Sequence, residues 1–246
     1  MSAADLQGFS LDRARRRAVC VHEAGHAVIH ALGGAYVYRV AVAPEGATSW
    51  GTTGRKGAEL SNLWGVCSAS DTLGQWFIRW EPEELTYSAD RRQFGELLRM
   101  FEATGNRAQG RRAVQETRRQ LRAQVCACLA GPAAEQLLEQ PSAEPDLWEG
   151  GLGDPDDDVA KAEAYSRLLP WRAEFEHLAA LTVATLRRPD VWAHVVAVAD
   201  ALEESGDLED EAVEKLLPMP ARDWPPSPRS KAASLLTVKS WQGGAA

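Results

Sequence analysis

Apolar and small residues recur at helical spacing near the start of the chain. Four of them are separated by four, three and four positions, which places them on one face of a helix: Val21, Gly25, Val28 and Leu32. Ser10 or Asp12 can cap the start of this helix, and Gly33-Gly34 can end it. The pattern therefore predicts a helix that continues to residue 32 and buries one face.

The segment after this helix changes to the pattern of a strand. Residues 36–43 are rich in β-branched and aromatic side chains, and a Pro-Glu-Gly turn signal follows them. Residues 48–53 are expected to return as a second, shorter strand. Helical periodicity marks the later segments, with a kink expected at Gly131-Pro132: 88–104, 109–138, 158–168, 171–188, 190–205 and 209–217. The expected fold is mainly α with a small β element, in which a helix and a short strand pair precede a helical bundle.

Composition and charge narrow the classes of function. The 246 residues carry a net charge of −8, with a pI of about 5.2, which argues against nucleic acid as the main partner. Two arginine-rich segments, 13–17 and 107–122, are interpreted as solvated helix faces, with a dedicated acidic partner as the alternative. No apolar run approaches the roughly 20 residues needed to span a bilayer, and the first residues lack the pattern of a secretory signal. We therefore expect a cytoplasmic protein with no membrane partner; the sequence indicates no oligomeric state.

The four cysteines do not form a metal-binding pattern. No Cys-x-x-Cys pair occurs, and three of the four lie in apolar helical stretches: Cys20, Cys126 and Cys128. These three are predicted to be buried free thiols, and Cys67 is the fourth cysteine.

The chemistry of the chain is concentrated in the predicted first helix, which contains His22-Glu-Ala-Gly-His26. The two histidines lie one helical turn apart on one face, so both imidazoles can reach a single Zn²⁺ ion. Glu23 lies beside the ion without needing to bind it, and can accept a proton from water that the ion activates. The motif predicts a zinc-dependent peptidase with Glu23 as the catalytic base.

A third ligand must come from elsewhere in the chain. His30 is one turn further along the same helix, too far to share the ion, and two other histidines remain, His177 and His194. An acidic loop opens a predicted helix and also offers carboxylates, although acidic residues favour helix N-termini for other reasons. The spacing alone does not choose among four of them: Asp154, Asp156, Asp157 and Asp158.

Three stretches resemble the zinc peptidase domain of the FtsH-type membrane AAA proteases. Residues 21–28 match that family's metal helix, and residues 38–44 and 50–53 are similar to its strand pair. Residues 129–135 are similar to an A-G-R-A-A-E helix, and residues 153–162 resemble the G-A-x-N-D-I-x-x-A segment that supplies the third ligand. The resemblance implies a zincin-like fold and a zinc metalloendopeptidase that acts on protein or peptide substrates.

The resemblance also assigns roles to single residues. It implies His22, His26 and Asp158 as zinc ligands, Glu23 as the base and Glu135 as a carboxylate that steadies a ligand imidazole. The reading of Glu135 as an ordinary helix-surface residue stays open beside this one. The chain departs from the family at Pro132, which replaces an arginine, and at Asp157, which replaces an asparagine.

The resemblance sets the expected domain organisation. Residues 1–217 are expected to form the FtsH-peptidase-like domain, with an insertion at about 55–106, and residues 218–246 a Pro-rich disordered tail. The insertion clusters four aromatic residues, which we interpret as a small core of their own rather than a cover over the cleft: Trp64, Trp76, Phe77 and Trp80. The family's ATPase domain and membrane anchor have no counterpart in the sequence.

These features lead to three hypotheses of function. The first is an ATP-independent zinc endopeptidase that cleaves flexible or unfolded segments, with residues 48–53 as the edge strand that pairs with the substrate backbone. The second is a non-proteolytic metal-binding module that recruits a partner on the same fold. The third is a latent enzyme blocked by its own tail.

Overall fold

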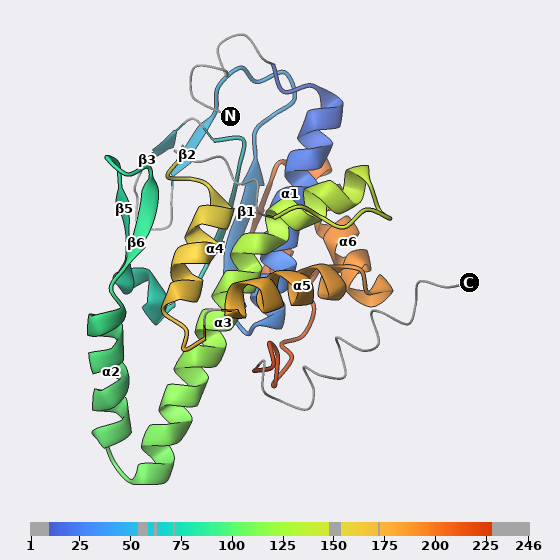
Figure 1. Ribbon diagram of the computed structural model, residues 1–246. Coiled ribbons are helices and arrows are strands. Elements are labelled where there is room, and N and C mark those ends of the chain that lie inside the picture. The colour runs from blue at the N-terminus through green and yellow to red at the C-terminus, as the bar shows by residue number, and fades with distance from the viewer. Residues whose placement is uncertain are drawn as a thin grey trace.

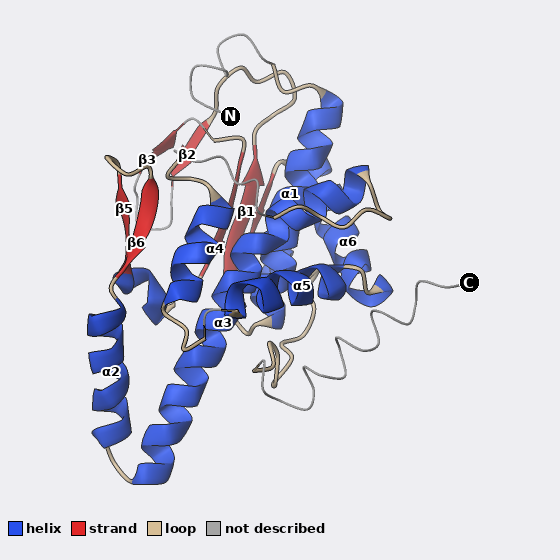
Figure 2. Ribbon diagram, in the orientation of Figure 1, coloured by secondary structure: helices blue, strands red, loops and turns tan. Residues whose placement is uncertain are grey.

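The computed structural model describes residues 10–53, 59–61, 63–70, 72–147, 154–171 and 173–227. Its helices are α1 (Arg13–Leu32), a 3₁₀ helix η1 (Leu73–Phe77), α2 (Arg91–Ala103), α3 (Arg107–Glu139), α4 (Asp158–Arg167), α5 (Glu174–Leu186), α6 (Pro189–Ser205) and α7 (Asp210–Glu214). Its strands are β1 (Val37–Val42), β2 (Gly51–Thr53), β3 (Glu59–Ser61), β4 (Gly65–Ala69), β5 (Ile78–Glu81), β6 (Thr86–Ala89) and β7 (Asp207–Glu209). The prediction of a mainly α fold with a small β element is confirmed (Figure 2).

Helix α1 is the central element of the fold. Asp12 caps it by accepting a hydrogen bond from the backbone N–H of Arg15, and Gly33 follows its last turn. The helix packs against α3 and α6 and against strands β1 and β4, so most of its second half is buried (Figure 1). Because α1 is surrounded in this way, its side chains are held by neighbours on several sides.

The strand that pairs with β1 is not the predicted one. Strand β1 lies between β4 and β7 in an antiparallel three-stranded sheet, whereas β2 pairs with β3. The chain after β1 turns toward the start of α1, where backbone hydrogen bonds join Leu11 to Gly46 and to Ala47. This connection prevents a direct hairpin return, so the expected pairing of residues 36–43 with 48–53 is wrong, and the partner strand comes from the predicted insertion.

Helices α2 and α3 form a long antiparallel hairpin that extends away from the rest of the molecule (Figure 1). Asn106 and Gln109 form a capping box at the start of α3. The helix continues through Pro132 to Glu139, so the predicted interruption does not end it. The residues that follow Pro132 therefore keep a helical register relative to those before it.

The remaining helices pack around α1 and α3. Helix α5 is joined to α3 by a buried ion pair, in which Nε and Nη2 of Arg122 lie 2.6 and 3.3 Å from the Glu174 carboxylate oxygens. No helix in the described ranges has both the length and the apolar character needed to cross a bilayer. The three cysteines predicted to be buried free thiols are confirmed as such.

The first residues of the predicted tail pack on the domain. Trp224 is 8% exposed, and the backbone N–H of Ala221 donates to the carbonyl of Leu32. The Arg119 guanidinium donates to the carbonyls of Gly33 and Trp224, which ties this segment to the end of α1. Residues 228–246 of the predicted tail lie outside the described residues.

Candidate metal centre

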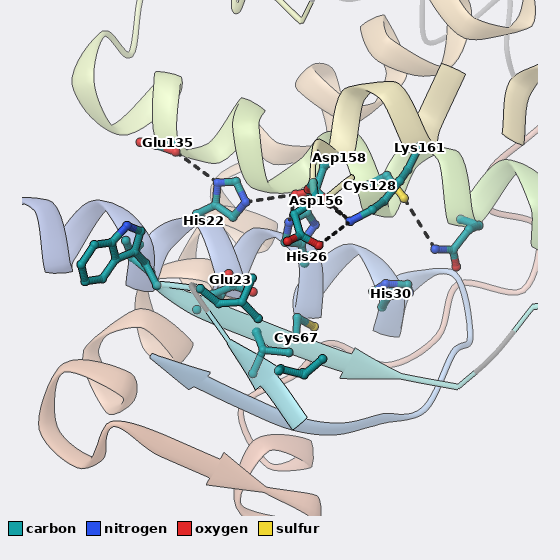
Figure 3. A pocket seen from close by; sticks show the side chains of 17 residues that line it. His22, Glu23, His26, His30, Cys67, Cys128, Glu135, Asp156, Asp158 and Lys161 are labelled. Carbon is teal, nitrogen blue, oxygen red and sulfur yellow. Dashed lines mark hydrogen bonds and ion pairs between the residues drawn. The ribbon is translucent and has the colours of Figure 1, made fainter. Parts of the chain in front are cut away.

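Two imidazoles from α1 and one carboxylate from α4 converge on one point (Figure 3). Nε2 of His22 lies 3.3 Å from Oδ2 of Asp158, and Nε2 of His26 lies 3.1 Å from the same oxygen. The three potential ligand atoms all lie within 4.8 Å of one another. Tetrahedral zinc with bonds of about 2.0–2.1 Å separates two ligand atoms by about 3.3–3.4 Å. The two histidine–aspartate separations are close to this value, so the three groups could hold a metal ion.

The other nitrogen of each imidazole is held by a fixed partner. Nδ1 of His22 lies 3.1 Å from Oε2 of Glu135, and Nδ1 of His26 lies 2.6 Å from the carbonyl oxygen of Ala127. A backbone carbonyl only accepts, so Nδ1 of His26 carries its hydrogen, and in a neutral ring Nε2 would direct a lone pair toward Asp158. Two acceptors that face each other at 3.1 Å need a proton or a cation between them.

Two glycines bring α3 close to α1 at this point. A β-carbon at Gly25 would lie 2.6 Å from the carbonyl oxygen of Ala130, and one at Gly131 would lie 2.3 Å from Nε2 of His26. These positions allow a backbone approach that any side chain would prevent. The Ala-Gly between the two histidines and the Gly before Pro132 thus set the distance between the imidazoles and the helix that supplies Glu135.

The carboxylates of the acidic segment 154–158 have different hydrogen-bond partners. Asp157 caps α4 by accepting from the N–H groups of Val159 and Ala160, and Asp154 accepts from the N–H of Asp156. The next residue, Asp158, begins the helix and turns its side chain to the histidines. Among the four candidates that the spacing left open, only Asp158 reaches them within the described residues.

Lys161 fixes the orientation of that carboxylate. Its ammonium lies 3.7 Å from Oδ1 of Asp158 and donates to the backbone carbonyl of Asp156 at 3.1 Å. Oδ1 is therefore paired with Lys161, while Oδ2 faces the imidazoles. Sequence analysis did not identify Lys161, although its position one turn after Asp158 on the same helix face is the spacing of an ion pair.

A residue of the predicted insertion also contacts the segment 154–157, which precedes α4. The Tyr87 hydroxyl on β6 donates to the carbonyl of Pro155 at 2.5 Å, and Arg167 on α4 donates to the Tyr87 carbonyl at 3.1 Å. The rings of Tyr87 and Trp80 meet edge to face at 5.2 Å. Part of the predicted insertion therefore holds the segment that carries Asp158.

Glu23 lies in the same cavity with its carboxylate unpaired. The residue is 7% exposed, and within the described ranges its carboxylate forms no hydrogen bond or ion pair. Burial raises its pKa, an effect that the neighbouring His22 and His26 partly offset. A β-carbon at Gly65 would lie 2.5 Å from Oε1 of Glu23, so strand β4 passes directly beside the carboxylate. A buried carboxyl group with a raised pKa is suited to accept a proton.

The electrostatics of the metal-free site favour a protonated His22. Burial alone would lower its pKa, but the hydrogen bonds to Asp158 and Glu135 outweigh burial and raise the pKa to about 10. For Asp158 burial acts in the raising direction, but the charge of His26 and the hydrogen bonds of both imidazoles hold its pKa well below the usual range. The hydrogen bond from His22 also lowers the pKa of Glu135. Binding of a metal ion would therefore displace a proton from His22.

A cavity of about 560 Å³ surrounds the cluster. Residues of α1, β3, β4, α3 and α4 contribute to its wall, among them His30 of α1 and Cys67 of β4. His30 does not belong to the cluster of potential ligands, and burial lowers its pKa to about 3. None of the predicted substrate-pairing residues 48–53 lines the cavity. The edge of the sheet beside the site is instead β4, which contributes Gly65, Val66 and Cys67.

The other two histidines play no part in this site. Nδ1 of His194 lies 2.7 Å from the carbonyl oxygen of Leu216, and Nε2 of His177 is buried without a hydrogen-bond partner in the described part of the chain.

Comparison of the sequence with protein-family models gave no match, and comparison with curated proteins gave none either.

Proposed function

We propose that the protein is a zinc-dependent endopeptidase that hydrolyses peptide bonds in flexible or unfolded protein segments. The observation that carries the proposal is the meeting of His22, His26 and Asp158 at one wall of an open cavity, with an unpaired Glu23 carboxylate in the same cavity. Three ligands leave a fourth position for water, which is the arrangement of catalytic rather than structural zinc sites. When bound, zinc supplies Lewis-acid polarisation of a carbonyl and activation of water.

The residues of the chain then have distinct tasks. Glu23 takes a proton from the attacking water and passes it to the leaving amine, because burial keeps its pKa raised. Glu135 and the Ala127 carbonyl hold the two imidazoles with Nε2 directed to the site. Lys161 holds Oδ1 of Asp158, so that the carboxylate offers one oxygen.

The shape of the site supports an extended substrate. A cavity of about 560 Å³ accepts a short stretch of chain and excludes a folded domain. Strand β4 is an edge strand of its sheet and passes beside Glu23, so its backbone can pair with the substrate. This assignment replaces residues 48–53, whose strand pairs with β3 and lies outside the cavity wall.

The proposal is tested by zinc content and casein cleavage in three proteins: the wild type, Glu23→Gln and Glu139→Gln. Glu139 lies one turn beyond Glu135 on α3 and is exposed, so the same chemical change there is a matched control. We expect all three to bind one zinc ion per chain and only Glu23→Gln to lose cleavage, by a factor of about 10² or more. Equal cleavage by wild type and Glu23→Gln would contradict the mechanism. If all three proteins bind zinc and none of them, the wild type included, cleaves casein, the result would favour a non-proteolytic module.

A further inference from the structure

The α2–α3 hairpin carries a concentrated positive charge on an otherwise acidic protein. Residues 91–122 contain nine arginines and three glutamates, while the whole chain has a net charge of −8. The hairpin extends away from the remaining helices and from the sheet (Figure 1). The charge is therefore segregated in space as well as in sequence.

Only part of this charge is neutralised within the molecule. Arg119 is paired with Glu116 at 2.6 Å, and Arg122 is paired with the buried Glu174. Arg92 and Arg99 share a single carboxylate, that of Glu96, at 3.8 and 4.0 Å. Five further arginines of this hairpin, all of which lies in the described ranges, form no ion pair there: Arg91, Arg107, Arg111, Arg112 and Arg118.

Three of the four unpaired arginines of α3 lie along one stripe, and the fourth, Arg112, donates to the carbonyl of Ala108. Arg107, Arg111 and Arg118 are separated by four and seven positions, which places them on one face of the helix. Arg107 and Arg111 are exposed, and Met100 on the adjacent helix is 59% exposed. An exposed methionine beside a row of arginines matches a partner that has both acidic and apolar side chains.

We infer that the α2–α3 hairpin, residues 91–118, is a docking surface for an acidic segment of another protein. Acidic protein fits better than nucleic acid for two reasons. The rest of the chain is strongly acidic and repels a polyanion that extends beyond the hairpin. The hairpin also offers no exposed aromatic ring for base stacking, because Phe94 is buried and Phe101 packs against the core.

The surface is separate from the metal centre. From Arg107 to Gly131, helix α3 rises about 36 Å, at about 1.5 Å per residue. Substitutions at Arg107 or Arg111 therefore leave the zinc ligands and Glu23 in place. Binding at the hairpin can be measured whether or not the protein cleaves anything.

The test is fluorescence anisotropy with a short labelled peptide of alternating glutamate and leucine, compared with a lysine–leucine peptide and with single-stranded and duplex DNA of similar charge. We expect the acidic peptide to bind wild type, more weakly as salt rises. The double variant Arg107→Glu/Arg111→Glu should bind it about tenfold more weakly or worse. The control is Arg13→Glu/Arg15→Glu, which makes the same charge change at the start of α1 and should bind like the wild type.

Thermal unfolding followed by circular dichroism checks that both double variants are folded. Equal losses in the hairpin variant and the control would show that net charge alone governs binding and would overturn the assignment. Absence of binding to wild type would overturn it as well. Tighter binding of either DNA than of the acidic peptide would replace the acidic protein partner with nucleic acid.

Discussion

Gly131 on α3 lies so close to His26 that a β-carbon on the glycine would stand 2.3 Å from Nε2 of the imidazole. The same β-carbon would be 2.6 Å from Nε2 of His22. Both distances are far shorter than ordinary van der Waals contact. The observed positions of the two imidazoles therefore require a residue without a side chain at position 131.

Gly131→Ala should abolish stoichiometric zinc binding while the protein stays folded, because the methyl group displaces both imidazoles from Asp158. Gly95→Ala is the control, since a β-carbon at residue 95 meets no atom within 4 Å. That control should keep zinc and gain about 0.5–1 kcal/mol of stability, as expected for alanine in place of glycine within a helix. Zinc content by atomic absorption and unfolding in urea measure both effects. Full zinc occupancy in Gly131→Ala would show that the imidazoles do not bind metal at this place.

Tyr87→Phe should weaken zinc binding by up to about tenfold, because the loop that carries Asp158 loses its hydrogen bond at Pro155. Chelator competition measures the affinity, and the absorption spectrum of the cobalt-substituted protein reports the ligand geometry. Tyr36→Phe removes a hydroxyl whose only hydrogen-bond partner in the described residues is Asp210, at 3.5 Å, and should leave both readouts unchanged. Identical spectra and affinities for Tyr87→Phe and wild type would show that the Tyr87 hydroxyl does not help to position Asp158.

The metal-free protein should lose stability as the pH rises from about 6.5 to about 10. The pKa of His22 is raised from 6.5 to about 10 in the folded state, so its stabilising contribution is complete below the unfolded pKa and lost through the folded one. Zinc affinity should change in the opposite sense and increase with pH, because the ion must displace that proton. Urea unfolding in the presence of a chelator, at pH 6 and pH 9.5, measures the first effect. In His22→Gln this pH dependence should be smaller; an unchanged dependence would exclude His22 as its source.

Glu174→Gln should destabilise the fold by about 3–5 kcal/mol, since it leaves the buried Arg122 guanidinium without its charge partner. Replacement of both residues, as Arg122→Met/Glu174→Leu, should recover most of that loss, because two apolar side chains avoid the cost of burying charge. Urea unfolding of the single and double variants gives the comparison. A double variant less stable than Glu174→Gln would mean that the ion pair itself stabilises the fold.

The sequence identifies the histidines and Glu23 because all three lie in one helical turn, where spacing alone determines which side chains share a face. The spacing alone does not single out Asp158 among the four aspartates of residues 154–158. The choice depends on which aspartate caps α4, and Asp157 takes that position. Capping is decided by the backbone at the helix end, which composition does not specify. The family resemblance favoured Asp158 through an alignment of motifs, not through this geometry.

The sheet could be predicted only in part, for a different reason. Strand β1 has a clear β-branched pattern, but β4 reads Gly-Val-Cys-Ser-Ala and β7 has three residues. Their pairing with β1 is long-range and depends on the path of the chain after Val42, which the hydrogen bonds at Leu11 redirect. The ion pair of Lys161 with Asp158 was accessible from its helical spacing, whereas the contact of Tyr87 with Pro155 joins segments that no local pattern connects.

The most direct test of the metal centre is a crystal structure of the zinc-loaded protein with diffraction recorded on both sides of the zinc absorption edge. We expect one anomalous peak in contact with Nε2 of His22, Nε2 of His26 and a carboxylate oxygen of Asp158, with the remaining position facing the cavity that Glu23 lines. A peak at another place, or a fourth protein ligand that closes the site, would contradict it.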